Sequence, residues 1–332
     1  MLWMRSASRA SLSLLLHLYA FAVIGLQVIW WQSREQYWPV ALLVMFSHWW
    51  MLPALALFPL ALFARWRSNA FSLGVVALSF LWIYGAFLLP APAQPASRPN
   101  RLTVATINTG GYRGNPEEIA DTILRTQADL VTLQEIVDAY VDEVQERTLE
   151  RYPYQVYRGG RALLGVAPIQ DAEFVDVDND PSRPHLFARV QMEGRSFRVV
   201  AAHTHPPVSV PLLYGRRYQP HPQSASMAEA LGKLTLASGE PAILLGDLNF
   251  PMRSTGYLAL RGLGLHDAYR RAGRGWSTGA TWPEGIERFG IVAEPFIRLD
   301  YVWHTGHFTA IDAYVGQPFV SDHRPVIATL AW

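Results

Sequence analysis

Leu245-Gly246-Asp247-Leu248-Asn249 joins the end of an apolar run to two polar side chains. The run Ala242–Leu245 is typical of a short buried strand, so Asp247 and Asn249 should follow at the end of that strand. An Asx turn would explain the pair equally well if it stood alone. Five other segments place polar residues at predicted strand ends: Thr106-Ile107-Asn108, Thr132-Leu133-Gln134-Glu135, Val200-Ala201-Ala202-His203-Thr204-His205, Arg298-Leu299-Asp300-Tyr301-Val302-Trp303 and Ser321-Asp322-His323-Arg324-Pro325.

Carboxylates, amides and imidazoles at the edge of a sheet suit the hydrolysis of phosphate esters with a hard metal ion. Oxygen ligands hold Mg²⁺, an imidazole handles a proton and amides orient phosphate oxygens. The chain has no Cys, and its His spacings match no helical zinc motif. Thiol chemistry and zinc-protease chemistry are therefore not indicated.

The sequence from Arg101 onward mixes short β-rich runs with segments of helical spacing. Strands are predicted at Leu102–Ile107, Leu130–Leu133, Leu163–Val166, Leu186–Gln191, Phe197–Ala202, Ala242–Leu245, Arg298–Trp303 and Val326–Leu330. Helices are predicted at Pro116–Thr126, Val137–Leu149 and Ser224–Ala237. Strands mixed with helices, some of them joined by hairpins, predict an α+β or α/β layered sandwich.

The six polar segments together resemble the endonuclease/exonuclease/phosphatase superfamily, the DNase I-like hydrolases. The resemblance covers Arg101–Trp332 and rests on Leu-Gln-Glu135, Gly-Asp247-Leu-Asn249, Arg-Leu-Asp300-Tyr-Val-Trp and Ser-Asp322-His323-Arg-Pro-Val. It implies an α/β (α+β) four-layer sandwich, with two mixed β-sheets face to face and helices outside. It also implies a catalytically competent enzyme rather than a degenerate relative, because all the expected parts are present.

The resemblance implies a site for Mg²⁺ or Mn²⁺. Glu135 corresponds to the principal carboxylate ligand, and Asn108 to the amide that supports metal and phosphate. Asp322, beside the catalytic His, would complete the metal site. Read alone, Glu135 would more simply cap the helix that follows it.

The resemblance also implies catalytic roles. His323 corresponds to the catalytic base or phosphate-contacting His, with Asp300 as its carboxylate partner. Asp247 would position the water or handle a proton, and Asn249 would bind a phosphate oxygen. His203 corresponds to a His that protonates the leaving oxygen or binds phosphate. Which group is the general base stays open.

Charged residues are few and unevenly distributed. The 332 residues are 50% hydrophobic and 17% charged, whereas soluble domains are roughly a quarter charged. Residues 1–94 hold five basic side chains and one acidic, and residues 95–332 hold 23 basic and 26 acidic. This distribution excludes a disordered tail, a disulfide-stapled miniprotein and a strongly basic nucleic-acid binder.

Three apolar runs predict membrane crossings at Leu12–Trp31, Pro39–Phe63 and Phe71–Pro90, each about the length that a bilayer requires. A signal peptide alone does not fit, because the apolar pattern continues through two further runs. We therefore predict a membrane domain with three transmembrane helices at 1–90, a Pro-rich linker at 91–100 and a catalytic domain at 101–332. The linker's prolines cannot continue a helix.

Positive charge predicts the orientation of these crossings. Arg5 and Arg9 precede the first, and Arg65 and Arg67 lie between the second and third. The positive-inside rule then places the N-terminus in the cytoplasm and, after three crossings, the catalytic domain outside. The predicted location is the cytoplasmic (inner) membrane of a bacterium, with the lipid bilayer as a partner and no obligate protein partner.

An enzyme tethered outside a bilayer meets lipid-linked phosphates more often than nucleic acid. The layout resembles teicoplanin-resistance-type membrane proteins and undecaprenyl-pyrophosphate phosphatases, which implies a pyrophosphate lipid as substrate. Arg216 and Arg217, in a Pro-rich segment after His203, and Arg298 are candidate phosphate contacts. A tethered nuclease, a sphingomyelinase-like phosphodiesterase and a lipid-binding scaffold with an inactive hydrolase domain stay open as alternatives.

Overall fold

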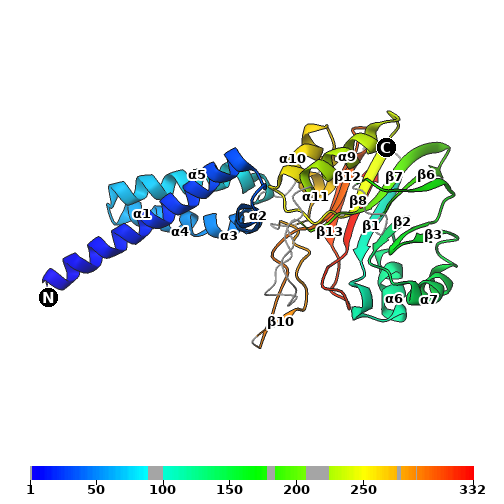
Figure 1. The fold of residues 1–332 in the computed structure, drawn as a ribbon, viewed down its shortest axis with the longest axis horizontal. Helices are drawn as coiled ribbons and strands as arrows, with labels where there is room; N and C mark the ends of the chain where they lie inside the picture. Colours follow the sequence, from blue (N-terminus) through cyan, green and yellow to red (C-terminus); the bar gives the residue numbers. More distant parts are fainter. Residues whose placement is uncertain (1, 89–99, 178–183, 207–223, 275–277, 289) are drawn as a thin grey trace. The chain divides into compact units, whose positions relative to one another are not determined.

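The computed structural model describes residues 2–88, 100–177, 184–206, 224–274, 278–288 and 290–332. The chain divides into two compact units, residues 1–89 and 90–332 (Figure 1). Almost all of the predicted linker, residues 91–100, lies outside the described residues.

The first unit is helical. Its helices are α1 (Leu2–Ser33), α2 (Trp38–Met45), α3 (Ser47–Met51), α4 (Pro53–Phe63) and α5 (Arg67–Leu88). Two stretches are long and apolar enough to cross a membrane, Ser8–Ser33 and Arg67–Gly85. The predicted middle crossing is instead a pair of helical pieces, Pro39–Met45 and Ser47–Phe63, bent by 68°. The unit therefore has two helices long and apolar enough to cross a membrane, or three such segments if the bent pair is one broken span.

Many large apolar side chains of this unit point outward. Phe63 and Trp82 are more than nine-tenths exposed, and Phe21 and Phe71 are more than three-quarters exposed. Some polar groups lie between helices, where the Ser13 hydroxyl donates to Asn69 Oδ1 over 2.8 Å. An apolar exterior around interhelical polar contacts is the arrangement expected of helices in lipid.

The second unit contains two six-stranded mixed sheets. The first has the order β13-β14-β1-β2-β4-β3, and the second has the order β5-β6-β7-β8-β12-β9. In the first, the strands are β1 (Arg101–Asn108), β2 (Leu130–Gln134), β3 (Tyr154–Arg158), β4 (Arg161–Gly165), β13 (Thr309–Val315) and β14 (Val326–Ala331). In the second, they are β5 (Ile169–Val175), β6 (His185–Met192), β7 (Arg195–His203), β8 (Ala242–Asp247), β9 (His266–Asp267) and β12 (Asp300–His304).

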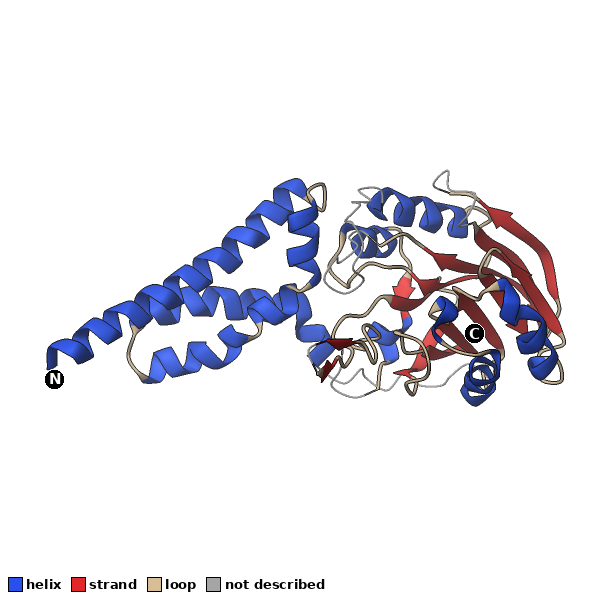
Figure 2. Cartoon of the chain, turned by 60° about the horizontal axis from the view of Figure 1, so that its bottom comes forward, coloured by secondary structure: helices blue, strands red, loops and turns tan. Residues whose placement is uncertain are grey.

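Successive side chains of a strand point to opposite faces of its sheet, and this alternation forms two separate cores. Leu102 and Val104 of β1 pack with Ile243 and Leu245 of β8 in one core between the two sheets. The alternate residues of β1, Ala105 and Ile107, face a second core beneath the helices. Helices flank the paired sheets on both sides (Figure 2), which confirms the predicted fold class for this unit.

Short helices flank the sheets of this unit (Figure 2). The described helices are η1 (Gly111–Arg113), α6 (Pro116–Thr126), α7 (Asp138–Thr148), α9 (Ser224–Leu236), α10 (Thr255–Gly262) and α11 (Ala268–Ala272). α6 begins at an Asn115 cap that accepts from the Glu118 amide, with Pro116 in the first turn. A short hairpin, β10 (Glu287–Arg288) with β11 (Ile291–Val292), completes the unit.

The same alternation brings polar residues to one end of the sandwich. Continuing the inward-facing positions of β1 leads to Asn108, and those of β8 lead to Asp247. In the second sheet, His203 of β7 pairs in register with Asp247, which in turn pairs with Asp300 of β12. Three predicted catalytic residues therefore stand side by side on neighbouring strands.

Candidate active site

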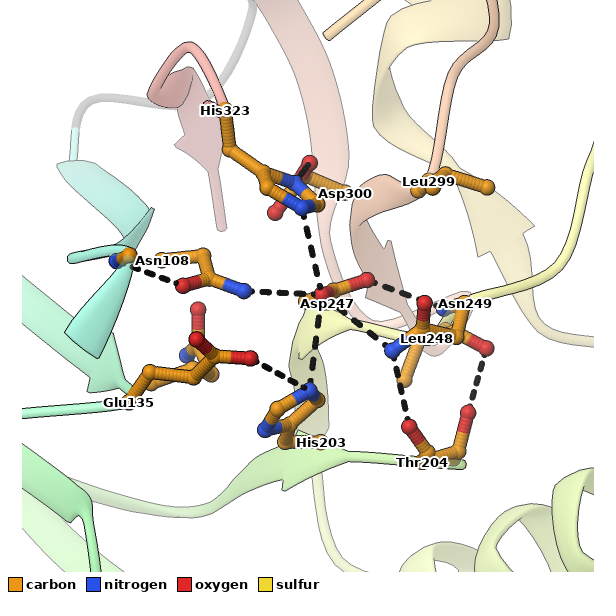
Figure 3. A network of polar contacts seen from close by, with 12 residues as sticks. Asn108, Glu135, His203, Thr204, Asp247, Leu248, Asn249, Leu299, Asp300 and His323 are labelled. Carbon is orange, nitrogen blue, oxygen red and sulfur yellow. Dashed lines mark hydrogen bonds and ion pairs between the residues drawn. The ribbon is translucent and has the colours of Figure 1, made fainter. Parts of the chain in front are cut away.

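Asp247 is the centre of a buried polar network (Figure 3). Its Oδ2 accepts hydrogen bonds from Asn108 Nδ2 at 2.9 Å and Asn249 Nδ2 at 3.2 Å, and its Oδ1 accepts from the Asn249 amide at 3.0 Å. The Nε2 atoms of His203 and His323 lie 3.5 and 3.7 Å from Oδ2. One carboxylate thus connects both sheets and both histidines.

Asp300 and His323 form a carboxylate–imidazole pair. His323 Nδ1 lies 2.8 Å from Asp300 Oδ2, and both side chains are buried. This contact leaves Nε2 of the ring facing Asp247. Burial lowers the pKa of His323, but the charges of Asp300 and Asp247 outweigh that effect and raise the pKa to about 10. The two carboxylates therefore favour the protonated form of the His323 ring.

Burial favours the neutral form of the Asp247 carboxyl, whereas it is the charged form of His323 that is favoured. Burial raises the pKa of Asp247 to about 7, with Asp300 adding repulsion and His323 and Asn108 partly offsetting both. A carboxyl group with a pKa near neutrality can exchange a proton during a reaction at neutral pH. The site thus contains one group held protonated and one that can accept a proton.

Glu135 follows β2 with backbone φ of +58°, in the left-handed region that non-glycine residues rarely adopt. Its side chain is 41% exposed, and Oε1 lies 3.7 Å from His203 Nε2. Asn249 has a similar φ of +50°. Backbone strain of this kind is maintained where surrounding structure fixes it, often at functional sites. The turn after β2 presents the Glu135 carboxylate at the open edge of the network.

The donor set fits a hard divalent cation. Ligand atoms of Asp247, Asp300 and His323 lie within 4.8 Å of one another. Within the described part of the chain, the buried Asp300 Oδ1 has no hydrogen-bond partner. Glu135 adds a partly exposed carboxylate beside this cluster. Clustered carboxylate oxygens are the ligands that Mg²⁺ and Mn²⁺ prefer.

The predicted ligands Asn108 and Asp322 take other positions. Asn108 Oδ1 accepts from the Gly110 amide at 2.9 Å while its Nδ2 donates to Asp247, so the amide orientation is fixed by both partners. Asp322 lies outside the cluster of ligand atoms, and its Oδ2 pairs with Arg113 Nη2 at 3.5 Å. In this arrangement Asn108 orients Asp247, and Asp322 orients an arginine.

The predicted phosphate contact Arg298 is engaged inside the fold. Its side chain is fully buried, forms an ion pair with Asp267, and lies over the rings of Tyr301 and Tyr269. The opposing carboxylate is 31 residues away in the chain, so the strand pattern gave no sign of this pairing. The other predicted contacts, Arg216 and Arg217, lie outside the described residues.

Two residues of the site carry no role in the sequence interpretation. Thr204 donates its hydroxyl to the Leu248 carbonyl, and its own carbonyl accepts from Asn249 Nδ2 at 2.8 Å. These bonds hold the turn after β8 against the end of β7 (Figure 3). Arg113 lies in the turn after Asn108. The signal available in the sequence was its position shortly after the Gly110-Gly111 pair, which follows the strand ending at Asn108.

Comparison with known proteins agrees with this geometry. A sequence model described as the endonuclease/exonuclease/phosphatase family matches residues 105–323. No curated protein sequence matches the chain significantly. Truncated TDP2 from Caenorhabditis elegans is similar in structure, with a TM-score of 0.54, 18% identity, and coverage of 71% of this chain and 99% of that one.

Two bacterial structures have the same fold. An endonuclease/exonuclease/phosphatase from Beutenbergia cavernae has a TM-score of 0.53 at 20% identity, covering 70% of this chain and 72% of its own. Sphingomyelinase C from Streptomyces griseocarneus has a TM-score of 0.50 at 19% identity, covering 69% and 99%. At these identities the structural likeness concerns the fold, and it does not select a substrate.

Proposed function

We propose that this chain, which belongs to the endonuclease/exonuclease/phosphatase family, is a membrane-anchored, divalent-metal-dependent hydrolase. Members of the family hydrolyse phosphoester bonds. The proposed substrate is a lipid-linked pyrophosphate such as undecaprenyl pyrophosphate. The observation that carries this proposal is a single chain holding both a carboxylate–histidine cluster and membrane-length apolar helices. A lipid substrate would explain those helices, because such a substrate is confined to the bilayer in which they would lie.

Glu135, at the open edge of the network, is the residue that would hold the metal ion, with the buried carboxylates of Asp247 and Asp300 beside it. When bound, the ion would neutralise phosphate charge and polarise the phosphorus–oxygen bond. Asn108 and Asn249 orient Asp247 through three hydrogen bonds from two sides. The family and the acidic cluster support a divalent metal without distinguishing Mg²⁺ from Mn²⁺.

The reaction consumes one water and breaks one bridging phosphorus–oxygen bond, giving inorganic phosphate and the lipid monophosphate. Asp247 takes a proton from the attacking water, since its pKa lies near 7. The His323 imidazolium, oriented by Asp300, stabilises negative charge on the phosphoryl oxygens. His203, adjacent to Asp247 and Glu135, is placed to hold or protonate the leaving oxygen.

Phosphate release from undecaprenyl pyrophosphate by the detergent-purified chain tests this proposal directly. We expect release that depends on Mg²⁺ and that falls at least 100-fold in Asp247→Ala, because proton transfer typically contributes 10²- to 10⁴-fold. A plasmid-nicking assay on the same preparations serves as the comparison.

Nicking without phosphate release would replace the lipid proposal with a membrane-tethered nuclease. Cleavage of sphingomyelin instead would indicate a phospholipid phosphodiesterase. Biological function retained in full by Glu135→Ala would indicate a scaffold that binds lipid without hydrolysing it. The net charge of −3 over residues 95–332 disfavours the nuclease, because basic side chains supply most affinity for nucleic acid.

A further inference from the structure

A glycine turn links Asn108 to the two other loops of the site. Gly110 and Gly111 have φ of +71° and +63°, which a residue with a side chain would adopt only with strain. A Cβ on Gly110 would lie 3.0 Å from Ser321 Oγ, and one on Gly111 would lie 3.8 Å from Glu135 Oε2. The turn therefore contacts the His323 loop on one side and Glu135 on the other.

Arg113 ends this turn and is fixed at the margin of the site. Its Cδ lies 3.1 Å from the position of a Cβ on Gly110, so its aliphatic part packs over the turn. Its Nη2 lies 3.5 Å from Asp322 Oδ2, with 43% of the Arg113 side chain exposed and 8% of that of Asp322. The guanidinium is thus held from one side and open to solvent on the other.

The charge balance of the site creates a need for such a cation. Glu135, Asp247 and Asp300 are carboxylates, and the imidazolium of His323 is already engaged by Asp300 and Asp247. A substrate with two adjacent phosphates brings more negative charge than a phosphodiester. The second phosphate would need a positive partner of its own outside the central cluster.

Two other arginines among the described residues of these loops form ion pairs with other carboxylates. Arg324, next to His323, is held by Glu284 and Glu294, and Arg298 is buried against Asp267. The Arg113–Asp322 contact is long and partly exposed, and ion pairs of this kind contribute little. Arg113 can therefore share its five planar donors with a ligand while Asp322 keeps it in place.

We infer that Arg113, oriented by Asp322, binds the second phosphate of a diphosphate substrate and so selects diphosphates over monophosphates and phosphodiesters. This inference rests on the proposed function and names the residue that would discriminate its substrate class. It also gives Asp322 a positioning role in place of metal coordination.

Calorimetric titration of the full detergent-purified chain with methylenediphosphonate tests the subsite, with methylphosphonate as the single-phosphonate probe. Mg²⁺ is kept in excess in one series and removed with chelator in another. We expect the wild type to bind the diphosphonate at least tenfold more tightly than the monophosphonate in both series. Arg113→Gln should lose that preference, and Arg113→Lys should keep part of it because it retains the charge.

The matched control is Arg125→Gln, an exposed arginine whose Nη2 bonds to Thr122 within α6. It removes the same charge and should bind both probes as the wild type does. Asp322→Asn should weaken diphosphonate binding less than Arg113→Gln, because it frees the guanidinium without removing it. Melting temperatures within a few degrees of the wild type would establish that the variants are folded.

Several outcomes would overturn the inference while leaving lipid pyrophosphate hydrolysis intact. These are equal binding of the two probes by the wild type, an unchanged preference in Arg113→Gln, or an equal loss of both probes in that variant. Conversely, a preference lost in Arg113→Gln, in a protein that releases no phosphate from undecaprenyl pyrophosphate, would support the subsite and refute the lipid substrate.

Discussion

At the scale of single residues, the pairing of Asp300 with His323 has a measurable consequence. Asp300→Asn removes the negative charge that keeps the imidazole protonated, so the pKa of His323 should fall from about 10 toward its ordinary value. His323 would then lose its proton at a lower pH, and activity should decline from a lower pH than in the wild type. We expect kcat at pH 7 to fall roughly 100-fold or more, in line with other oriented imidazoles.

The measurement is a kcat–pH profile of phosphate release. Asp312→Asn is the matched control, because that carboxylate pairs with the exposed Arg274 on the surface. The control should keep the wild-type profile. An Asp300→Asn profile identical in shape to that of the wild type would show that His323 does not act as the imidazolium.

The residues of the site differ in how far the sequence could assign them. Asp247, Asp300 and His203 followed from polar residues at strand ends, since neighbouring strands bring such ends together in register. The pairing of Arg298 with Asp267 could not be predicted, because it joins segments that meet only in the folded sheet. The ion pair of Asp322 could not be predicted for a related reason, since its partner Arg113 lies more than 200 residues earlier.

At the scale of secondary-structure elements, Asp267 connects several pieces of the second sheet's outer layer. It caps α11 by accepting from the amides of Tyr269 and Arg270, accepts from the Tyr257 hydroxyl of α10, and pairs with Arg298 just before β12. Removing one partner of a buried ion pair leaves an uncompensated charge. Arg298→Met should therefore lower stability by about 3–5 kcal/mol.

Thermal unfolding in detergent measures this effect, and a loss of that size lowers the melting temperature by roughly 10 °C. Arg274→Met, which breaks an exposed pair with Asp312, is the control and should cost less than about 1 kcal/mol. Below the melting transition, KM of Arg298→Met should stay within about threefold of wild type. A raised KM with an unchanged melting temperature would restore Arg298 as a phosphate contact.

Elements with a strong internal pattern were predictable and those with a weak one were not. β1 and β8 are buried along almost their whole length, and the apolar runs predicted both strands. β5 has a mostly exposed central stretch with a register shift between Gln170 and Glu173, so its sequence has no strand-like run. The bend between α2 and α3 at Phe46 lies inside a continuous apolar stretch, where hydropathy alone shows no break.

At the scale of the whole molecule, that bend decides on which side of a membrane the catalytic unit would lie. Three crossings put the N-terminus and the catalytic unit on opposite faces, whereas two crossings put them on the same face. The arginine pairs before the first crossing and at Arg65 and Arg67 favour three, because both pairs would then face the cytoplasm. We expect the bent pair to cross as one broken span.

The absence of cysteine makes this directly measurable. The experiment introduces one cysteine at a time at an exposed residue. The three variants are Gln36→Cys between the first and second predicted crossings, Ala64→Cys between the second and third, and Ser196→Cys in the catalytic unit. A membrane-impermeant maleimide added to intact spheroplasts should label Gln36→Cys and Ser196→Cys. It should label Ala64→Cys only after lysis. Labelling at positions 36 and 64 with protection at 196 would make the bent pair re-entrant. The catalytic unit would then be cytoplasmic, and its substrate would have to be a phosphate presented at the inner leaflet.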